Sequence, residues 1–162
     1  MGISWPEFRG MEKKEQKKRI REYDTLLWME EMMHKPSLKW YRIGKKNFGY
    51  EMCYRNTINP TYPAKARTNS LQLEEHIGRG LINYDKTCKL CETEEDLEHF
   101  LTRCPELNTK RDPDIMKEII DMTPEQKTTH ILYDNKQYSK VAKMIRNMWE
   151  YRKYRKDNLR PP

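Results

Sequence analysis

The chain has 162 residues, of which 36% are hydrophobic and 35% are charged, and its net charge is +7. This length suits one domain or a small domain with helical arms, and its apolar content is low enough that a bound metal would help it fold. No run of eighteen apolar residues is present, which excludes a membrane-spanning helix, and the N-terminus lacks the apolar segment of a signal peptide. We therefore expect an intracellular protein, compatible with the nucleus, whose cysteines stay reduced.

Residues 1–36 are predicted to form an N-terminal helical arm. The segment from Glu12 to about His34 has no Gly or Pro and is rich in helix-forming residues, and Pro36 ends it. Its apolar residues recur at helical spacing: Ile20, Tyr23, Leu26, Leu27, Met29 and Met33. We predict that Met29, Met32 and Met33 fill a core. The basic stretch 13–19 is interpreted as a solvated helix face rather than a nucleic-acid contact.

Residues 37–110 are predicted to hold linker helices and a metal-binding module. An aromatic stretch begins at 37–41, and the short apolar segment 50–54 fits either a helix or a strand. The prolines in 59–63 favour a turn or a linker, and a helix is expected within 64–78. Cys53 is interpreted as a small buried hydrophobe.

Residues 111–162 are predicted to form C-terminal helices with a basic tail. Asp112-Pro113 and Thr123-Pro124 are each typical of a helix start. The last helix is expected from about Gln137 to Asp157, with one buried face made by Tyr138, Val141, Ile145 and Met148. The predicted fold class is therefore mostly α: a small helical domain with long N- and C-terminal helices.

The segment Cys88–Cys104 contains the strongest motif, C-x2-C-x7-H-x4-C, and three of the four cysteines of the chain. Three thiolates and one imidazole complete the tetrahedral shell that Zn²⁺ prefers, so Cys88, Cys91, His99 and Cys104 are predicted to bind one structural zinc ion. A redox-active Cys-x-x-Cys is the alternative, but the strand that would precede it is missing and two further ligands follow at suitable spacing.

Inside this motif, Thr93 is predicted to cap a short helix that carries His99. Five carboxylates lie between Cys91 and His99, at positions 92, 94, 95, 96 and 98. Because carboxylates repel phosphate, this face is expected to be a poor direct contact for nucleic acid.

The positive charge of the chain lies at its C-terminus. Residues 136–160 contain nine Lys or Arg and two acidic residues, whereas residues 1–135 sum to zero. The segment 151–156 alternates aromatic and basic residues, which suits phosphate neutralisation and base stacking. The predicted nucleic-acid contacts are Arg146, Arg152, Lys153, Arg155 and Lys156. The alternative is a solvated helix end whose tyrosines pack on a neighbour.

Several short segments within residues 37–110 together form a recognisable pattern: Ser37–Tyr41, Ala66–Leu73, Arg79–Ile82, the Cys-x2-Cys pair, Glu95–Leu101 and Cys104-Pro105. This pattern resembles the zinc-binding region at the C-terminus of non-LTR (LINE-type) retrotransposon reverse transcriptases and, at 37–41, the helical linker before it. The resemblance implies the same four zinc ligands and a role near template RNA or target DNA. It also implies either a C-terminal module or a stand-alone, domesticated derivative.

No catalytic activity is expected, because the chain contains neither a polymerase Tyr-x-Asp-Asp motif nor a Ser/His/Asp or phosphate-cradling motif. We therefore predict a non-enzymatic, zinc-stabilised module that binds RNA or DNA mainly through phosphate, with no membrane and no small-molecule substrate. The alternative is a non-catalytic structural adaptor or subunit in a protein or ribonucleoprotein assembly, with a protein partner in that larger complex.

Overall fold

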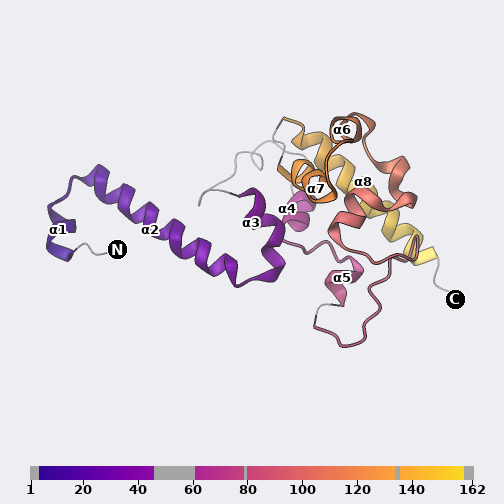
Figure 1. Ribbon diagram of the computed structural model, residues 1–162, viewed down its shortest axis with the longest axis horizontal. Helices are drawn as coiled ribbons and strands as arrows, with labels where there is room; N and C mark the ends of the chain where they lie inside the picture. Colours follow the sequence, from indigo (N-terminus) through magenta and orange to yellow (C-terminus); the bar gives the residue numbers. More distant parts are fainter. Residues whose placement is uncertain (1–3, 46–60, 79, 134–135, 159–162) are drawn as a thin grey trace.

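The computed structural model describes residues 4–45, 61–78, 80–133 and 136–158. Helices make up most of this structure, and no strand is found among the described residues, which confirms the predicted mostly α class. Figure 1 shows a compact helical body from which the N-terminal helices extend as an arm. The predicted segment 50–54 and Cys53 lie outside the described residues.

The arm consists of α1 (Trp5–Gly10) and α2 (Lys13–Met33). The side-chain amide of Gln16 donates to the Phe8 carbonyl at 2.9 Å, which holds α1 against the start of α2. The other end of α2 meets the body, where the Trp28 and Tyr41 ring centroids lie 6.1 Å apart and Arg42 donates to the Met33 carbonyl at 2.9 Å.

The prediction that the three methionines of α2 fill a core is wrong for two of them. Met32 is the only residue of α2 that is buried, whereas Met29 and Met33 are exposed. Because only the last turns of α2 meet the body, helical spacing alone could not show which apolar residues are covered.

The body begins with a 3-10 turn (Pro36–Leu38) and α3 (Lys39–Gly44). The next described helices are α4 (Thr61–Arg67) and α5 (Glu74–Ile77). The predicted single helix within 64–78 is thus split, because Asn69 and Gln72 adopt left-handed backbone angles, with φ of 53° and 58°. The prediction of a turn or linker at 59–63 is also wrong from Thr61 onward, where α4 begins.

The loop of residues 80–96 carries Cys88 and Cys91 and is called the metal-ligand loop below. Two short helical segments follow it, His99–Arg103 and Pro105–Lys110. The chain ends with α6 (Pro113–Glu118), α7 (Pro124–Tyr133) and α8 (Tyr138–Asn158). Asp112 caps α6 as predicted, because its side chain accepts from the next backbone N–H groups. Thr123 and Gln126 exchange hydrogen bonds at the start of α7.

The core lies where α4, α7 and the segment that follows Cys104 pack against α8, while α3 packs against α4 and α7. The predicted face of the last helix is confirmed, because Tyr138, Val141, Ile145 and Met148 are all buried. One apolar cluster runs from Trp40 to Met148, so the segments 37–110 and 111–162 share a core. The Trp149 indole donates to the Leu71 carbonyl at 2.7 Å and ties α8 to the stretch before α5.

Candidate metal centre

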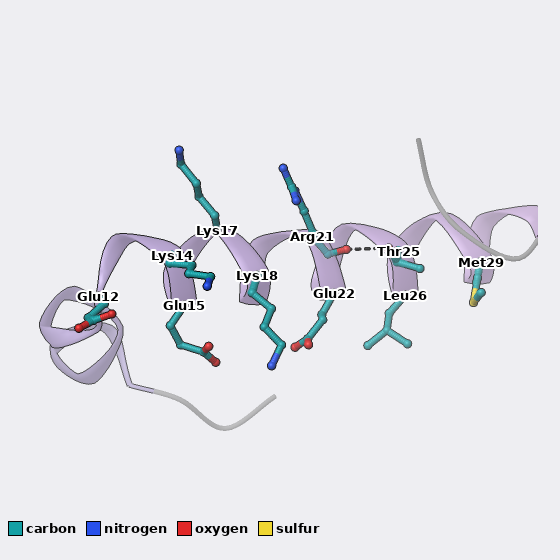
Figure 2. A pocket seen from close by; sticks show the side chains of 10 residues that line it. All are labelled: Glu12, Lys14, Glu15, Lys17, Lys18, Arg21, Glu22, Thr25, Leu26 and Met29. Atoms are coloured by element: carbon teal, nitrogen blue, oxygen red, sulfur yellow. Dashed lines mark hydrogen bonds between the residues drawn. The ribbon is translucent and has the colours of Figure 1, made fainter. Parts of the chain in front are cut away.

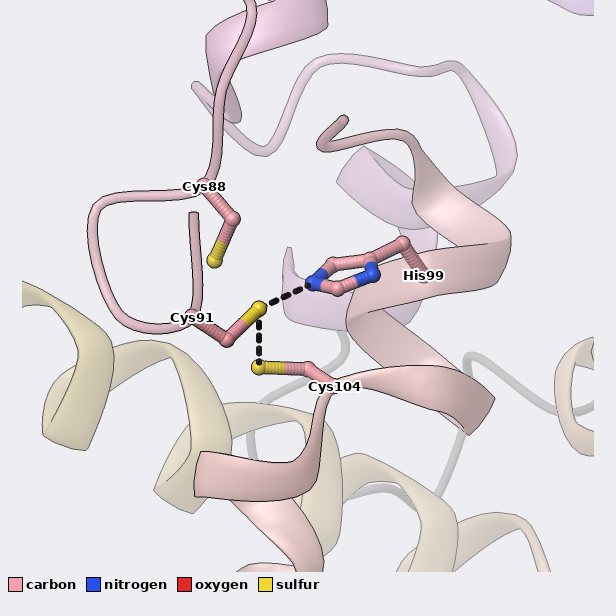
Figure 3. A group of neighbouring side chains, drawn as sticks. All are labelled: Cys88, Cys91, His99 and Cys104. Atoms are coloured by element: carbon pink, nitrogen blue, oxygen red, sulfur yellow. Dashed lines mark hydrogen bonds between the residues drawn. The ribbon is translucent and has the colours of Figure 1, made fainter. Parts of the chain in front are cut away.

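The four predicted ligands converge in one small volume. The thiol sulfurs of Cys88, Cys91 and Cys104 and a ring nitrogen of His99 all lie within 4.8 Å of one another (Figure 3). Cys91 Sγ lies 3.2 Å from His99 Nε2 and 3.8 Å from Cys104 Sγ. Bonds of about 2.3 Å to sulfur and about 2.0 Å to nitrogen give tetrahedral edges close to these separations. The structure therefore contains a set of side chains that could bind a metal ion.

A tight backbone turn presents the first two cysteines. The Glu92 N–H donates to the Cys88 carbonyl at 2.9 Å, and the Cys88 N–H donates to the Thr93 carbonyl at 2.7 Å. Glu92 occupies the left-handed region, with φ of 61°, which lets the chain reverse directly after Cys91. The turn thus places both sulfurs on the side that faces His99.

The helix that carries His99 starts later than the sequence predicts. Its first turn begins at Leu97, and its N-terminal cap is Asp96, whose carboxylate accepts from the His99 N–H at 2.6 Å. Thr93 instead places its hydroxyl 3.2 Å from Cys91 Sγ and 3.3 Å from His99 Nδ1. The prediction of Thr93 as the cap is wrong, because a nearer carboxylate satisfies the free N–H groups.

The thiols of Cys88 and Cys104 shift each other's pKa. Hydrogen bonding with Cys104 and burial raise the pKa of the Cys88 thiol to about 12, whereas the same bond with Cys88 lowers the pKa of Cys104. The set of side chains by itself therefore keeps a proton on Cys88 at neutral pH. A cation that binds there must displace this proton, as metals do at thiol sites.

Glu95, which lies inside the metal-ligand loop, anchors this loop to α8. Its carboxylate accepts two hydrogen bonds from the Arg152 guanidinium, at 2.6 Å to Oε1 and 2.5 Å to Oε2. The same carboxylate accepts from the Glu74 N–H at 2.7 Å, at the start of α5. The side chains of Glu95 and Arg152 are only 1% and 6% exposed. One carboxylate thus joins three segments that are distant in sequence.

Glu74 extends this buried network. Its carboxylate accepts from Tyr84 at 2.8 Å and from Lys156 at 2.5 Å, and Arg152 donates to it at 3.2 Å. Burial raises the pKa of Glu74, but the hydrogen bonds from Lys156 and Tyr84 outweigh this effect and hold the pKa below its ordinary value. Burial likewise lowers the pKa of Arg152, and Glu95 more than compensates.

The five predicted nucleic-acid contacts therefore fall into two groups. Arg152 is buried and Lys156 is held by Glu74, so neither belongs to the open surface of α8. Arg146, Lys153 and Arg155 lie on that surface, where Arg146 pairs with Glu150 at 2.7 Å and the Lys153 amine lies 5.7 Å from the centre of the Trp149 ring.

Sequence reasoning missed the buried network of Glu74, Glu95, Arg152 and Lys156. Glu95 stands in a run of carboxylates and Arg152 in a run of cations, so the local sequence does not distinguish either residue from its neighbours. Of the five carboxylates between Cys91 and His99, Glu95 faces inward, whereas Glu92 and Glu94 remain exposed.

No protein-family model matches the sequence, and the comparisons with curated proteins and with solved structures find no match. Within the described ranges, none of the helices combines the length and the apolar character needed to cross a bilayer.

Proposed function

We propose that this chain is a zinc-stabilised module that binds RNA or DNA mainly through phosphate. Zn²⁺ is the metal that best suits three thiolates and one imidazole at tetrahedral separations. Four protein ligands leave no open position for substrate or water, so the ion would serve the fold and not catalysis. The resemblance to retrotransposon reverse transcriptases agrees with this role and stays a prediction.

The observation that carries the nucleic-acid proposal is the open face of α8. The buried side of this helix is apolar except for Arg152, and its accessible positions carry Lys140, Lys143, Arg146, Lys153 and Arg155 together with the acidic Glu150 and Asp157. Lys143 and Arg155 form no ion pair within the described part of the chain. Cations presented by a rigid helix would neutralise phosphates and displace their counterions.

An aromatic side chain lies among these cations. Tyr154 is 67% exposed and lies between Lys153 and Arg155 in the last turns of α8. Base stacking on an exposed ring tolerates any sequence, so the proposed contact favours single-stranded nucleic acid with little sequence preference.

A salt titration of binding to single-stranded RNA and duplex DNA tests this proposal. The variant Lys143→Gln, Lys153→Gln, Arg155→Gln should lose affinity, and its log–log salt slope should flatten by about 2–3 units, at about 0.7–0.9 for each phosphate that the variant no longer neutralises. Because the three side chains are exposed, the variant should keep its helix content and its metal content.

The matched control is Lys65→Gln, Lys86→Gln, Lys117→Gln, which removes the same charge from exposed positions outside α8. If both variants lose affinity equally, binding follows net charge and the proposed face is wrong. An affinity of the parent protein that does not change with salt would refute the phosphate contact altogether.

The alternative function, a non-catalytic structural adaptor in a protein or ribonucleoprotein assembly, is favoured by the apolar residues that α2 exposes. A pull-down after nuclease treatment distinguishes the two. Recovery of one stoichiometric protein partner, together with salt-insensitive or absent nucleic-acid binding, would favour the adaptor.

A further inference from the structure

The arm helix α2 exposes an apolar patch, flanked by Arg19 and Glu30, on the side opposite its contact with the body. At 100° per residue, Trp28 and Met32, which meet the body, lie on one side of the helix. The opposite half carries the exposed apolar residues Ile20, Tyr23, Leu26, Leu27 and Met33, whereas the exposed Met29 lies nearer to Met32. Ile20, Tyr23, Leu26 and Leu27 lie together along about 10 Å of helix and form an apolar patch of the kind that another helix covers.

The charges of α2 are separated along its axis. The first half, 13–21, contains six basic residues and one acidic residue, whereas the second half, 22–33, contains four acidic residues and no basic one. Figure 2 shows the basic part of α2, where Lys17 and Arg21 project on one side and Lys18 on the other, with Leu26 and Met29 further along. The basic charge thus surrounds the first half of the helix, and the apolar patch continues into the acidic half.

We propose that α2 pairs with α2 of a second copy of this chain in antiparallel orientation. The middle of the 21-residue helix is Tyr23, and a two-fold axis there places the basic half of each copy beside the acidic half of the other. In this arrangement Ile20 of one copy faces Leu26 of the other, and the two Tyr23 rings meet at the axis. A parallel pair would instead place like charges together along the whole contact, which costs free energy.

The geometry of the arm allows such a pair. Ile20, Tyr23 and Leu27 follow one another at separations of three and four residues, which is the spacing of the contact line between two packed helices. Because Trp28 and Met32 hold the body on the other side of α2, this contact line stays free of the body's attachment. The proposal is independent of the metal and of the function proposed for α8.

Sedimentation of the metal-loaded, nucleic-acid-free chain tests the pairing, from about 5 to about 500 µM protein. The expected result is a reversible monomer–dimer equilibrium. Ile20→Glu places a carboxylate against the acidic half of the partner and should weaken the dimer at least about tenfold. Ile20 is 49% exposed, so the fold should be unaffected, and Ile82→Glu, at a residue that is 92% exposed in the body, is the matched control.

The salt dependence of dimerisation distinguishes the antiparallel from the parallel orientation of the two helices. For the antiparallel pair, raising salt from about 50 to about 500 mM screens attraction and should weaken the dimer, whereas in a parallel pair it would screen repulsion and strengthen the dimer. A chain that stays monomeric throughout would overturn the proposal and leave this surface to a different protein. Dimers that Ile20→Glu does not affect, or that strengthen with salt, would also overturn it.

Discussion

Replacing Arg152 by Ala should unfold the body far more readily than its position in a basic tail suggests. The substitution removes two short hydrogen bonds to Glu95 and one to Glu74, and it leaves two carboxylates that are each 1% exposed without their shared cation. Lys156 still reaches Glu74, but among the described residues no other side-chain cation binds the Glu95 carboxylate.

The expected cost follows from that burial. Breaking a buried ion pair by removing one partner costs about 3–5 kcal/mol, because the remaining charge stays away from water. For a chain of this size, each kcal/mol shifts the Tm by about 2–4 °C, so Arg152→Ala should lower the Tm by about 6–20 °C.

Thermal unfolding of the metal-loaded protein, followed by circular dichroism, measures this effect. Arg155→Ala is the matched control, because Arg155 lies one turn further along the same helix, is exposed and should change stability by less than about 0.5 kcal/mol. A double-mutant cycle of Arg152→Met with Glu95→Gln isolates the pair, and the double variant should lose about 1–3 kcal/mol less than the sum of the single variants.

The opposite pattern would refute this reasoning. If Arg152→Ala keeps the parent Tm within about 2 °C and weakens nucleic-acid binding as much as Lys153→Ala does, then Arg152 is a surface contact. A cycle with no coupling energy would likewise show that Glu95 and Arg152 act independently.

Three further outcomes are expected. A strong chelator should release one zinc ion per chain, as elemental analysis can measure, and should unfold the metal-ligand loop. Cys104→Ser should unfold the loop without chelator, since structural zinc contributes about 10–16 kcal/mol to folding in peptides. The folded-state pKa of Glu74 is below its ordinary value of 4.5, so its contribution to stability is full above that pH and is lost as pH falls through the folded pKa. The Tm of Glu74→Gln should therefore fall less than that of the parent between pH 5 and pH 3, and an equal fall would contradict this. Gly44→Ala should destabilise the body because a Cβ at this position would overlap the Tyr133 ring, whereas Gly10→Ala meets open space and should not, as urea unfolding can compare.

The sequence predicts most helices because their signals are local. Asp112 before Pro113 and the apolar spacing of Tyr138 to Met148 need no information from distant residues, and both agree with the structure. The break between α4 and α5 escaped prediction because Asn69 and Gln72 adopt left-handed angles that tertiary contacts stabilise and that neither residue type requires. The exposure of Met33 was missed for a similar reason, because helical periodicity identifies a face and not the partner that covers it.

The candidate site likewise combines features that the local sequence predicts with features that depend on distant residues. Four ligands within seventeen residues could be assigned from spacing, because coordination restricts them to a short stretch of chain. The pairing of Glu95 with Arg152 joins residues 57 positions apart, and nothing in either neighbourhood separates these two from their like-charged neighbours. Only the arrangement of α5 and α8 around the loop identifies them.

That pairing changes how the metal-ligand loop and the basic helix are related. Glu95 lies between Cys91 and His99, so any ion that fixes the loop also fixes the carboxylate that holds Arg152. Arg152 in turn lies one residue before Lys153 and three before Arg155, whose side chains point outward from the same turns of α8. In the proposed function, the four candidate metal ligands would influence nucleic-acid binding without a direct contact, because the metal-ligand loop, which carries two of them, packs against the buried side of the helix that carries the proposed phosphate contacts. The acidic loop and the basic tail, which appear opposed in sequence, are therefore two sides of one packed unit.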